Sequence, residues 1–301
     1  MTEYDERPAA DGPPERGEVA ADGSIEAPAP QPIDPLPPSQ AIAEIRIHAP
    51  TRGNRKLERL FQNANADAQL KAWWHVAAVN ATRRLGMSDH SWVHIQVVVN
   101  IALRLTRLLV KRGVKPSMVA DFGMTDRDAE VVVAAGAMLH CVGMSIHRTD
   151  HEAYSLFLTA DKIGLLLDGI YEEPERSVVA AEVMHAIIGH RKNGKPFTVE
   201  AGIVRVADAL DMAKGRSRVP FEAGQTNIHA LSAAAIDQVS ILPGNEKPVR
   251  IDIEMNNSSG IFQVDELLAQ KLSGSGIEDF IEVTAFIEGE TERRLLPEFR
   301  I

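Results

Sequence analysis

The stretch HSWVHIQVVVNIALRLTRLLVKRG, residues 90–113, is a long and largely apolar run. Apolar residues follow His94 at the intervals of one helical face: Val98, Ile101, Leu105 and Leu108. Gly113 and then Pro116 end the run, as is typical of the C-terminus of a helix. We therefore predict a long, mostly buried helix whose inward face carries a histidine.

Further segments with helical periodicity lie on both sides of this helix. They cover residues 54–86, 125–143, 149–171, 175–190 and 198–215. Thr125 and Asp128 have the spacing of a capping box at the start of one of them. The sequence therefore predicts a mainly α fold for this part of the chain.

The pattern changes after about residue 230. Short β-like runs cover residues 235–242, 249–256, 280–287 and 293–299, and the second alternates apolar and polar positions. Residues 262–272 read as a helix between the second and third runs. This order predicts a small α+β module, in which a helix covers one face of an open sheet.

The first forty residues differ in composition from the rest of the chain. They contain nine of the seventeen prolines, nine acidic residues and two basic ones. Such a segment has little apolar surface to bury and cannot form a helix or a central strand, so we predict a disordered tail. It is either a passive solubilising tail or a docking segment. The predicted domains are therefore the tail (1–44), a helical domain (45–225) and the α+β module (226–301).

Composition also excludes several classes of protein. No uninterrupted apolar run approaches the roughly 20 residues that span a bilayer, and the acidic N-terminus is not a secretory signal. A single cysteine cannot form an internal disulfide, which points to the cytoplasm. Residues 41–301 carry only −3 of the total charge of −10 and show no basic stripe, which argues against a nucleic-acid partner. The apolar C-terminal strands are compatible with a homo-oligomer.

Polar residues interrupt the apolar faces of several predicted helices. His94, His140, His185 and Asp208 each share a face with apolar neighbours. A lone inward histidine is usually a hydrogen-bonded core residue, but a buried carboxylate is costly unless it is paired or bound to metal. Spacing alone leaves both interpretations open: separate core residues, or ligands that converge on a cation.

His94 at the start of a long helix, His140 within LHCVGM and Asp208 within VRVADALD resemble the HD superfamily of metal-dependent phosphohydrolases. That family has a His, a His-Asp pair and a later Asp, all on helices, and the match covers roughly residues 75–215. The resemblance implies an HD-type helical bundle in which His94, His140 and Asp208 bind metal. Position 141 should also be a ligand, but it is Cys141 instead of Asp.

The resemblance implies further roles around these ligands. Among His147, His151, His185 and His190, we favour His185 as an additional ligand because its face is inward. His147 and Arg148 are expected to contact substrate. The basic run after the Asp208 helix would bind phosphate, or else cap the helix: Lys214, Arg216 and Arg218.

Two residues one turn from the ligands have expected catalytic roles. His90 precedes His94 and could donate a proton or support the ligand, while Asp89 is the expected helix N-cap. Asp211 follows Asp208 and could orient a ligand or the basic run.

The expected function is hydrolysis of a small phosphate ester, such as a nucleotide, by water that a divalent metal activates. The metal could be iron, zinc, manganese or magnesium. Cys141 leaves three outcomes open: the thiolate binds metal, the thiol stays protonated beside a weaker site, or the site is catalytically dead. In the last case the chain would be a nucleotide-binding sensor or a scaffold protein.

Overall fold

The helix predicted from residues 90–113 is α4, which runs from Trp92 to Lys111 in the computed structural model. The hydroxyl of Ser91 accepts a hydrogen bond from the backbone N–H of Val93 and caps the helix. Gly113 follows the last turn with a φ of +85°, which glycine adopts without strain. The structure describes residues 36–213 and 232–287 of the chain.

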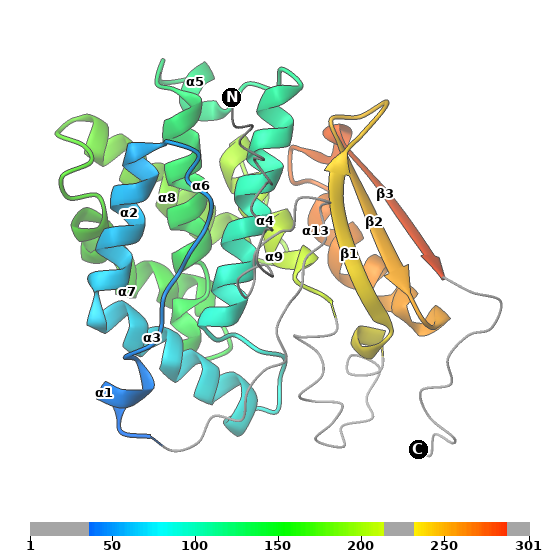
Figure 1. Cartoon of the computed structure of the whole chain (residues 1–301), viewed down its shortest axis with the longest axis horizontal. Coiled ribbons are helices and arrows are strands. Elements are labelled where there is room, and N and C mark those ends of the chain that lie inside the picture. The colour runs from blue at the N-terminus through cyan, green and yellow to red at the C-terminus, as the bar shows by residue number, and fades with distance from the viewer. Residues whose placement is uncertain (1–35, 214–231, 288–301) are drawn as a thin grey trace, which may run out of the picture.

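The other long helices form a bundle with α4 (Figure 1). They are α2 (Arg55–Ala66), α3 (Ala68–Ala78), α6 (Asp126–Leu139), α7 (His151–Leu166), α8 (Glu175–Gly189) and α9 (Val199–Leu210). Shorter elements are α1 (Pro38–Ala41), α5 (Ser117–Ala120), a π-helix η1 (Val79–Arg84) and a 3₁₀ turn η2 (Val142–Ser145). This helical body confirms the predicted mainly α fold, and the predicted capping box is present at the start of α6.

Two glycines permit close approaches between these elements. A Cβ added at Gly136 in α6 would lie 2.9 Å from the Cβ of Ala186 in α8. A Cβ added at Gly143 in η2 would lie 2.0 Å from the backbone oxygen of His151, the first residue of α7. Close-packed interiors do not tolerate such contacts, so both positions favour glycine. As a result, the ends of α6 and α8 and the start of α7 meet in one place.

The C-terminal module contains a three-stranded sheet in the order β1-β2-β3. Strands β1 (Ile236–Pro243) and β2 (Val249–Met255) are antiparallel, whereas β3 (Ile281–Ile287) runs parallel to β2. Its helical stretch consists of α12 (Ile261–Gln263), a π-helix η4 (Val264–Ala269) and α13 (Gln270–Leu272), with 3₁₀ turns η3 (Ser258–Gly260) and η5 (Glu278–Phe280). The alternating burial along β2 confirms the predicted strand pattern.

The module packs directly against the helical body, with α13 close to α9 (Figure 1). Arg104 of α4 donates from Nε to the backbone carbonyl of Ile241 in β1 at 2.6 Å. Gly202 in α9 admits the backbone of Ser275, because a Cβ there would lie 2.3 Å from the Ser275 carbonyl oxygen. The module therefore rests on the two helices that carry His94 and Asp208.

Three local predictions need correction. Asp89 is not the N-cap of α4, because its carboxylate accepts hydrogen bonds from the backbone and hydroxyl of Ser91, which takes that place. The proline-rich segment forms one helical turn, α1, since Pro38 occupies the first helical position, where a missing N–H costs little. The helix predicted over residues 125–143 ends at Leu139, and His140 is its C-cap.

Residues 1–35, 214–231 and 288–301 lie outside the described residues. The predicted disordered tail falls there up to residue 35, as do the basic run at Lys214, Arg216 and Arg218 and the strand over residues 293–299, and these stay predictions. The domain boundaries stay predictions as well.

Two helical segments of the described chain are long and apolar enough to cross a membrane by composition alone, Trp92–Lys111 and Asp126–Ser145. Inside the protein, 72% of the first apolar window and 89% of the second are buried. Their apolar residues therefore build the core of the helical body.

Candidate metal centre

Three side-chain atoms, carried by three helices or their ends, form a largely buried triangle. Nε2 of His94, in α4, lies 3.2 Å from Nε2 of His140, at the end of α6. Oδ1 of Asp208, in α9, lies 3.5 Å from the first nitrogen and 3.6 Å from the second. The fold thus brings together the three predicted ligands from distant parts of the sequence.

The spacing of these atoms fits a metal ion. Ligand atoms about 2.1 Å from a tetrahedral metal stand about 3.4 Å from one another. The triangle has edges of 3.2, 3.5 and 3.6 Å, which bracket that separation. Imidazole nitrogens with a carboxylate oxygen suit zinc, iron or manganese better than magnesium, which prefers oxygen ligands alone. The buried His, Cys and Asp groups could therefore bind a metal ion.

Hydrogen bonds on the far side of each imidazole orient the histidines. Nδ1 of His94 lies 2.6 Å from Oδ2 of Asp211, and Nδ1 of His140 lies 2.7 Å from the carbonyl oxygen of Ala137. His190 makes the same kind of bond to the carbonyl of Ile187. Each acceptor favours the tautomer with the proton on Nδ1, which leaves the Nε2 lone pair for a metal.

Electrostatics favour a cation at His140. Burial lowers the pKa of this imidazole, but the charges of Cys141 and Asp208 outweigh burial and raise the pKa to about 10. Without a metal, His140 therefore holds a proton, which a divalent cation would replace. His190 behaves differently, because burial and the positive charges of His140 and Lys271 hold its pKa well below the usual range. It therefore stays in the neutral, metal-binding form.

Cys141 lies beside this triangle and is almost fully buried. A ligand atom from each of His94, His140 and Cys141 falls within 4.8 Å of the other two. The sulfur is therefore close enough to contribute a soft ligand where the HD pattern has an aspartate. Because the two ligand types differ in charge and softness, Cys141 bears on which metal the site selects.

A second group of candidate ligands adjoins the first. His190 lies in a T-shaped contact with His140, with ring centroids 4.8 Å apart, and its ring is 5.5 Å from that of His151. Ligand atoms of His151, Glu152 and His190 fall within 4.8 Å of one another, as do those of His140, His190 and Asp208. His190 belongs to both groups, so the candidate ligands extend to His151 and Glu152 at the start of α7.

The structure does not bring His185 into this centre, although we favoured it as the additional ligand. Its Nε2 accepts a hydrogen bond from the backbone N–H of Phe197 at 2.9 Å, and its ring stacks on that of Phe197. His190, one residue beyond the end of α8, lies in the centre in its place. His140 is likewise the residue just after α6. Both histidines therefore lie at the C-terminus of a helix, a position that helical periodicity does not mark.

The two expected catalytic residues both line the cavity at this centre. Asp211 contacts Nδ1 of His94, as described above, so its carboxylate lies where it could orient this imidazole. The ring of His90 lies 5.4 Å from that of His94, and its Nδ1 is 2.8 Å from the carbonyl oxygen of Ser88. His90 thus stands at the edge of the centre.

The expected substrate-binding residues fall in different places. Arg148 lines the cavity, with its Nη1 3.0 Å from Nδ1 of His151. His147 is exposed, accepts a hydrogen bond from the backbone of Thr149 and does not line the cavity. His147 therefore lies outside the wall of this cavity.

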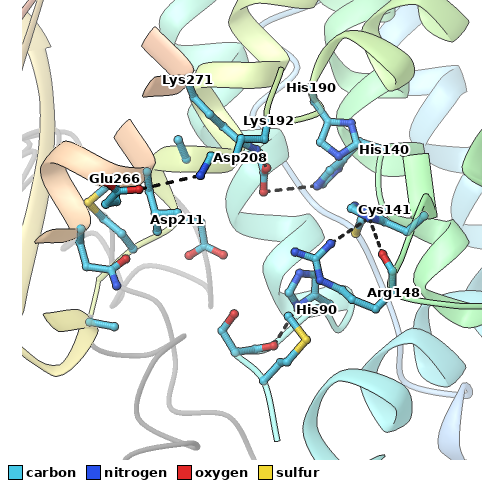
Figure 2. Close-up of a pocket in the computed structure, with 18 of the residues that line it drawn as sticks. His90, His140, Cys141, Arg148, His190, Lys192, Asp208, Asp211, Glu266 and Lys271 are labelled. Atoms are coloured by element: carbon cyan, nitrogen blue, oxygen red, sulfur yellow. Dashed lines mark hydrogen bonds and ion pairs between the residues drawn. The ribbon is translucent and has the colours of Figure 1, made fainter. Parts of the chain in front are cut away.

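A cavity of about 550 Å³ opens onto the centre (Figure 2). Its volume lies within the range typical of small-molecule sites. Asp208, His140 and His190 lie on one side together with two cations, Lys192 and Lys271. Of these two, only Lys271 was not expected from the sequence. Apolar side chains line other parts of the wall: Leu85, Met87, Ala209, Met212, Ala233 and Leu267.

Comparisons with known proteins show similarity in sequence to other proteins. No family model and no solved structure matches the chain. Over 145 residues it is 31% identical to Ribonuclease Y of Desulforudis audaxviator, an alignment that covers 48% of this chain and 25% of that protein. Over 233 residues it is 37% identical to the uncharacterized protein MJ1020 of Methanocaldococcus jannaschii, covering 77% of this chain and 88% of that protein. The chain therefore belongs to the same family as MJ1020.

Proposed function

We propose that this protein is a metal-dependent phosphohydrolase of the HD type that acts on a small phosphate ester, with a nucleotide as the expected substrate. The observation that carries the proposal is the triangle of His94, His140 and Asp208 at a cavity of about 550 Å³. The alignment with Ribonuclease Y, which has an HD domain, supports the same reaction class.

The residues of the centre would have two roles, metal binding and orientation of a ligand. His94, His140 and Asp208 would hold a divalent metal, with His190 and Cys141 beside them. Such a metal lowers the pKa of water and neutralises charge on phosphoryl oxygens. Asp211 keeps the imidazole of His94 in the binding orientation.

Other residues would bind the substrate and move protons. Arg148 presents a guanidinium at the cavity, and a planar guanidinium suits the oxygens of a phosphate. Since Nδ1 of His90 is bonded to the carbonyl of Ser88, its Nε2 is the atom that would exchange protons with the substrate, and it can give a proton to the leaving oxygen only from the doubly protonated ring. The apolar wall with Met87 and Met212 would contact a base or another weakly polar leaving group.

A second candidate function rests on Cys141. The HD pattern has an aspartate there, so a protonated thiol could leave a centre that binds nucleotide without hydrolysing it. The protein would then be a sensor or a scaffold. The cavity and the cations would serve binding in either case.

One experiment separates the two functions. Purified protein is loaded with zinc, manganese or iron and assayed with p-nitrophenyl phosphate, bis-p-nitrophenyl phosphate and nucleoside monophosphates. We expect turnover that needs the metal and falls more than about 100-fold in His140→Ala, since removal of supporting residues alone costs about 10–100-fold. If wild type is inactive with every metal and Cys141→Asp gains activity, the protein is a sensor or a scaffold and not a phosphohydrolase.

A further inference from the structure

The C-terminal module contributes a cation to the centre. Lys271, in α13, forms an ion pair with Oδ2 of Asp208, whose other oxygen faces His94 and His140. The lysine side chain is 16% exposed and lines the cavity (Figure 2). One carboxylate thus joins the histidine pair to a lysine from a different part of the fold.

A buried arginine fixes the position of this lysine. Arg205, in α9, is 2% exposed, and its Nε donates to the backbone carbonyl of Lys271 at 2.8 Å. Its Nη2 donates to the carbonyls of Lys192 at 2.9 Å and Gln270 at 3.2 Å. The guanidinium of Arg205 therefore connects α13 to the loop after α8. Burying a guanidinium is costly unless its donors are satisfied, and here backbone carbonyls accept from them.

Lys271 differs from the other two cations at the cavity. Lys192 is 67% exposed on its side chain and lies 3.8 Å from Glu266, whereas Arg148 contacts His151. Lys271, by contrast, forms an ion pair with a residue of the triangle, Asp208. An ammonium group has three N–H donors, so the bond to Asp208 leaves donors that a phosphoryl oxygen can take.

We propose that Lys271 is a substrate-binding residue that the C-terminal module supplies, and that its ammonium group binds a phosphoryl oxygen of the substrate next to Asp208. Arg205 is a positioning residue for it. This inference rests on the proposed function, because it assigns the phosphate-binding cation of the same site. It also gives the α+β module a role in the site itself.

Binding of inorganic phosphate to the full-length, zinc-loaded protein tests this assignment by isothermal titration calorimetry. We expect Lys271→Met to weaken phosphate binding at least about tenfold, as loss of a charged hydrogen bond implies. Lys271→Arg should restore much of the affinity, because the charge returns. Zinc affinity should change less than phosphate affinity in both variants.

A matched control separates binding from the packing of the module. Lys247 also belongs to the module, does not line the cavity and donates to the carbonyls of Glu278 and Ile281. Lys247→Met should therefore keep wild-type phosphate affinity. If Lys271→Met fails to fold, Lys271→Gln takes its place, with the same expected loss.

The outcomes are distinct from those for the proposed function. Phosphate affinity that is unchanged in Lys271→Met, or that falls equally in Lys247→Met, overturns the assignment. Neither result depends on turnover, so an inactive wild type would overturn the hydrolase proposal while leaving this comparison intact. In an active wild type, the variant should raise KM for a phosphate ester more than it lowers kcat.

Discussion

Nδ1 of His94 lies 2.6 Å from Oδ2 of Asp211, and the same imidazole turns its Nε2 toward His140 and Asp208. The carboxylate therefore lies behind the histidine rather than in the triangle. This arrangement is typical of metal sites, where a second residue fixes the tautomer and the direction of the ligand.

Removal of this support should weaken metal binding. In Asp211→Ala we expect zinc affinity to fall about 10–100-fold, because the His94 ring loses its anchor. Isothermal titration calorimetry on metal-depleted protein measures the change. Asp161→Ala, an exposed acidic residue in α7, is the control for loss of one negative charge. Equal affinities in wild type and Asp211→Ala would contradict the orienting role.

Two histidines of the same chain segment should behave differently. His190→Ala should lower metal affinity or stoichiometry, because its imidazole lies beside His140 and near Asp208. His185→Ala should keep both, since its ring stacks on Phe197 outside the centre. Elemental analysis of the two variants after identical loading makes the comparison. A loss of metal in His185→Ala, with full metal content in His190→Ala, would contradict the placement of His190 in the centre.

We expect the stability of the protein to depend on the close packing at Gly143, which lies near the candidate metal centre. Gly143→Ala places a Cβ against the backbone of His151, so we expect a loss of about 1–3 kcal/mol in the free energy of unfolding. Gly164→Ala in α7 meets no atom within 4 Å and should be neutral or stabilising by up to about 1 kcal/mol. Urea denaturation measures both. A Gly143→Ala protein as stable as wild type would contradict the close approach of η2 and α7.

A buried network predicts a pH-dependent contribution to stability. Tyr171 donates from its hydroxyl to Asp128 at 2.7 Å, and Lys56 pairs with the same carboxylate at 2.6 Å. Burial raises the pKa of Asp128, but hydrogen bonds from Lys56, Thr125 and Tyr171 outweigh it and hold the pKa below its usual value. Tyr171→Phe should therefore cost about 1.5–3 kcal/mol at neutral pH.

The direction with pH follows from this lowered pKa. The native state binds fewer protons than the unfolded chain, so the contribution is present above the unfolded pKa of about 3.9 and is lost as pH falls through the folded pKa. The difference between wild type and Tyr171→Phe should shrink below about pH 4. Tyr154→Phe, a half-exposed residue of α7, is the control. A difference that grows in acid would contradict the network.

Helical periodicity was sufficient to predict the inward positions of His94 and Asp208, because both lie within long amphipathic helices. It could not predict His190, which follows the end of α8 and has no helical face to mark it. It favoured His185 instead, whose face is only half-buried. The ends of helices are set by local capping and by tertiary contacts, so residues there are harder to place from sequence.

Lys271 could not be found from sequence for a different reason. It stands 63 residues after Asp208 on a polar stretch of the C-terminal module, and no local pattern connects the two. Their contact depends on how the module packs on α9 through Arg205 and Gly202. The sequence predicted the module itself, with its strands and helix, but gave no reason to connect it with the metal centre.

The central claim is that His94, His140 and Asp208 form a metal centre. Elemental analysis by mass spectrometry of wild type, His140→Ala and His185→Ala, each incubated with zinc, manganese and iron and then dialysed, tests it most directly. We predict at least one metal ion per chain in wild type and His185→Ala and a large loss in His140→Ala. Wild type without bound metal, or a His140→Ala protein that keeps the full amount, would contradict the account.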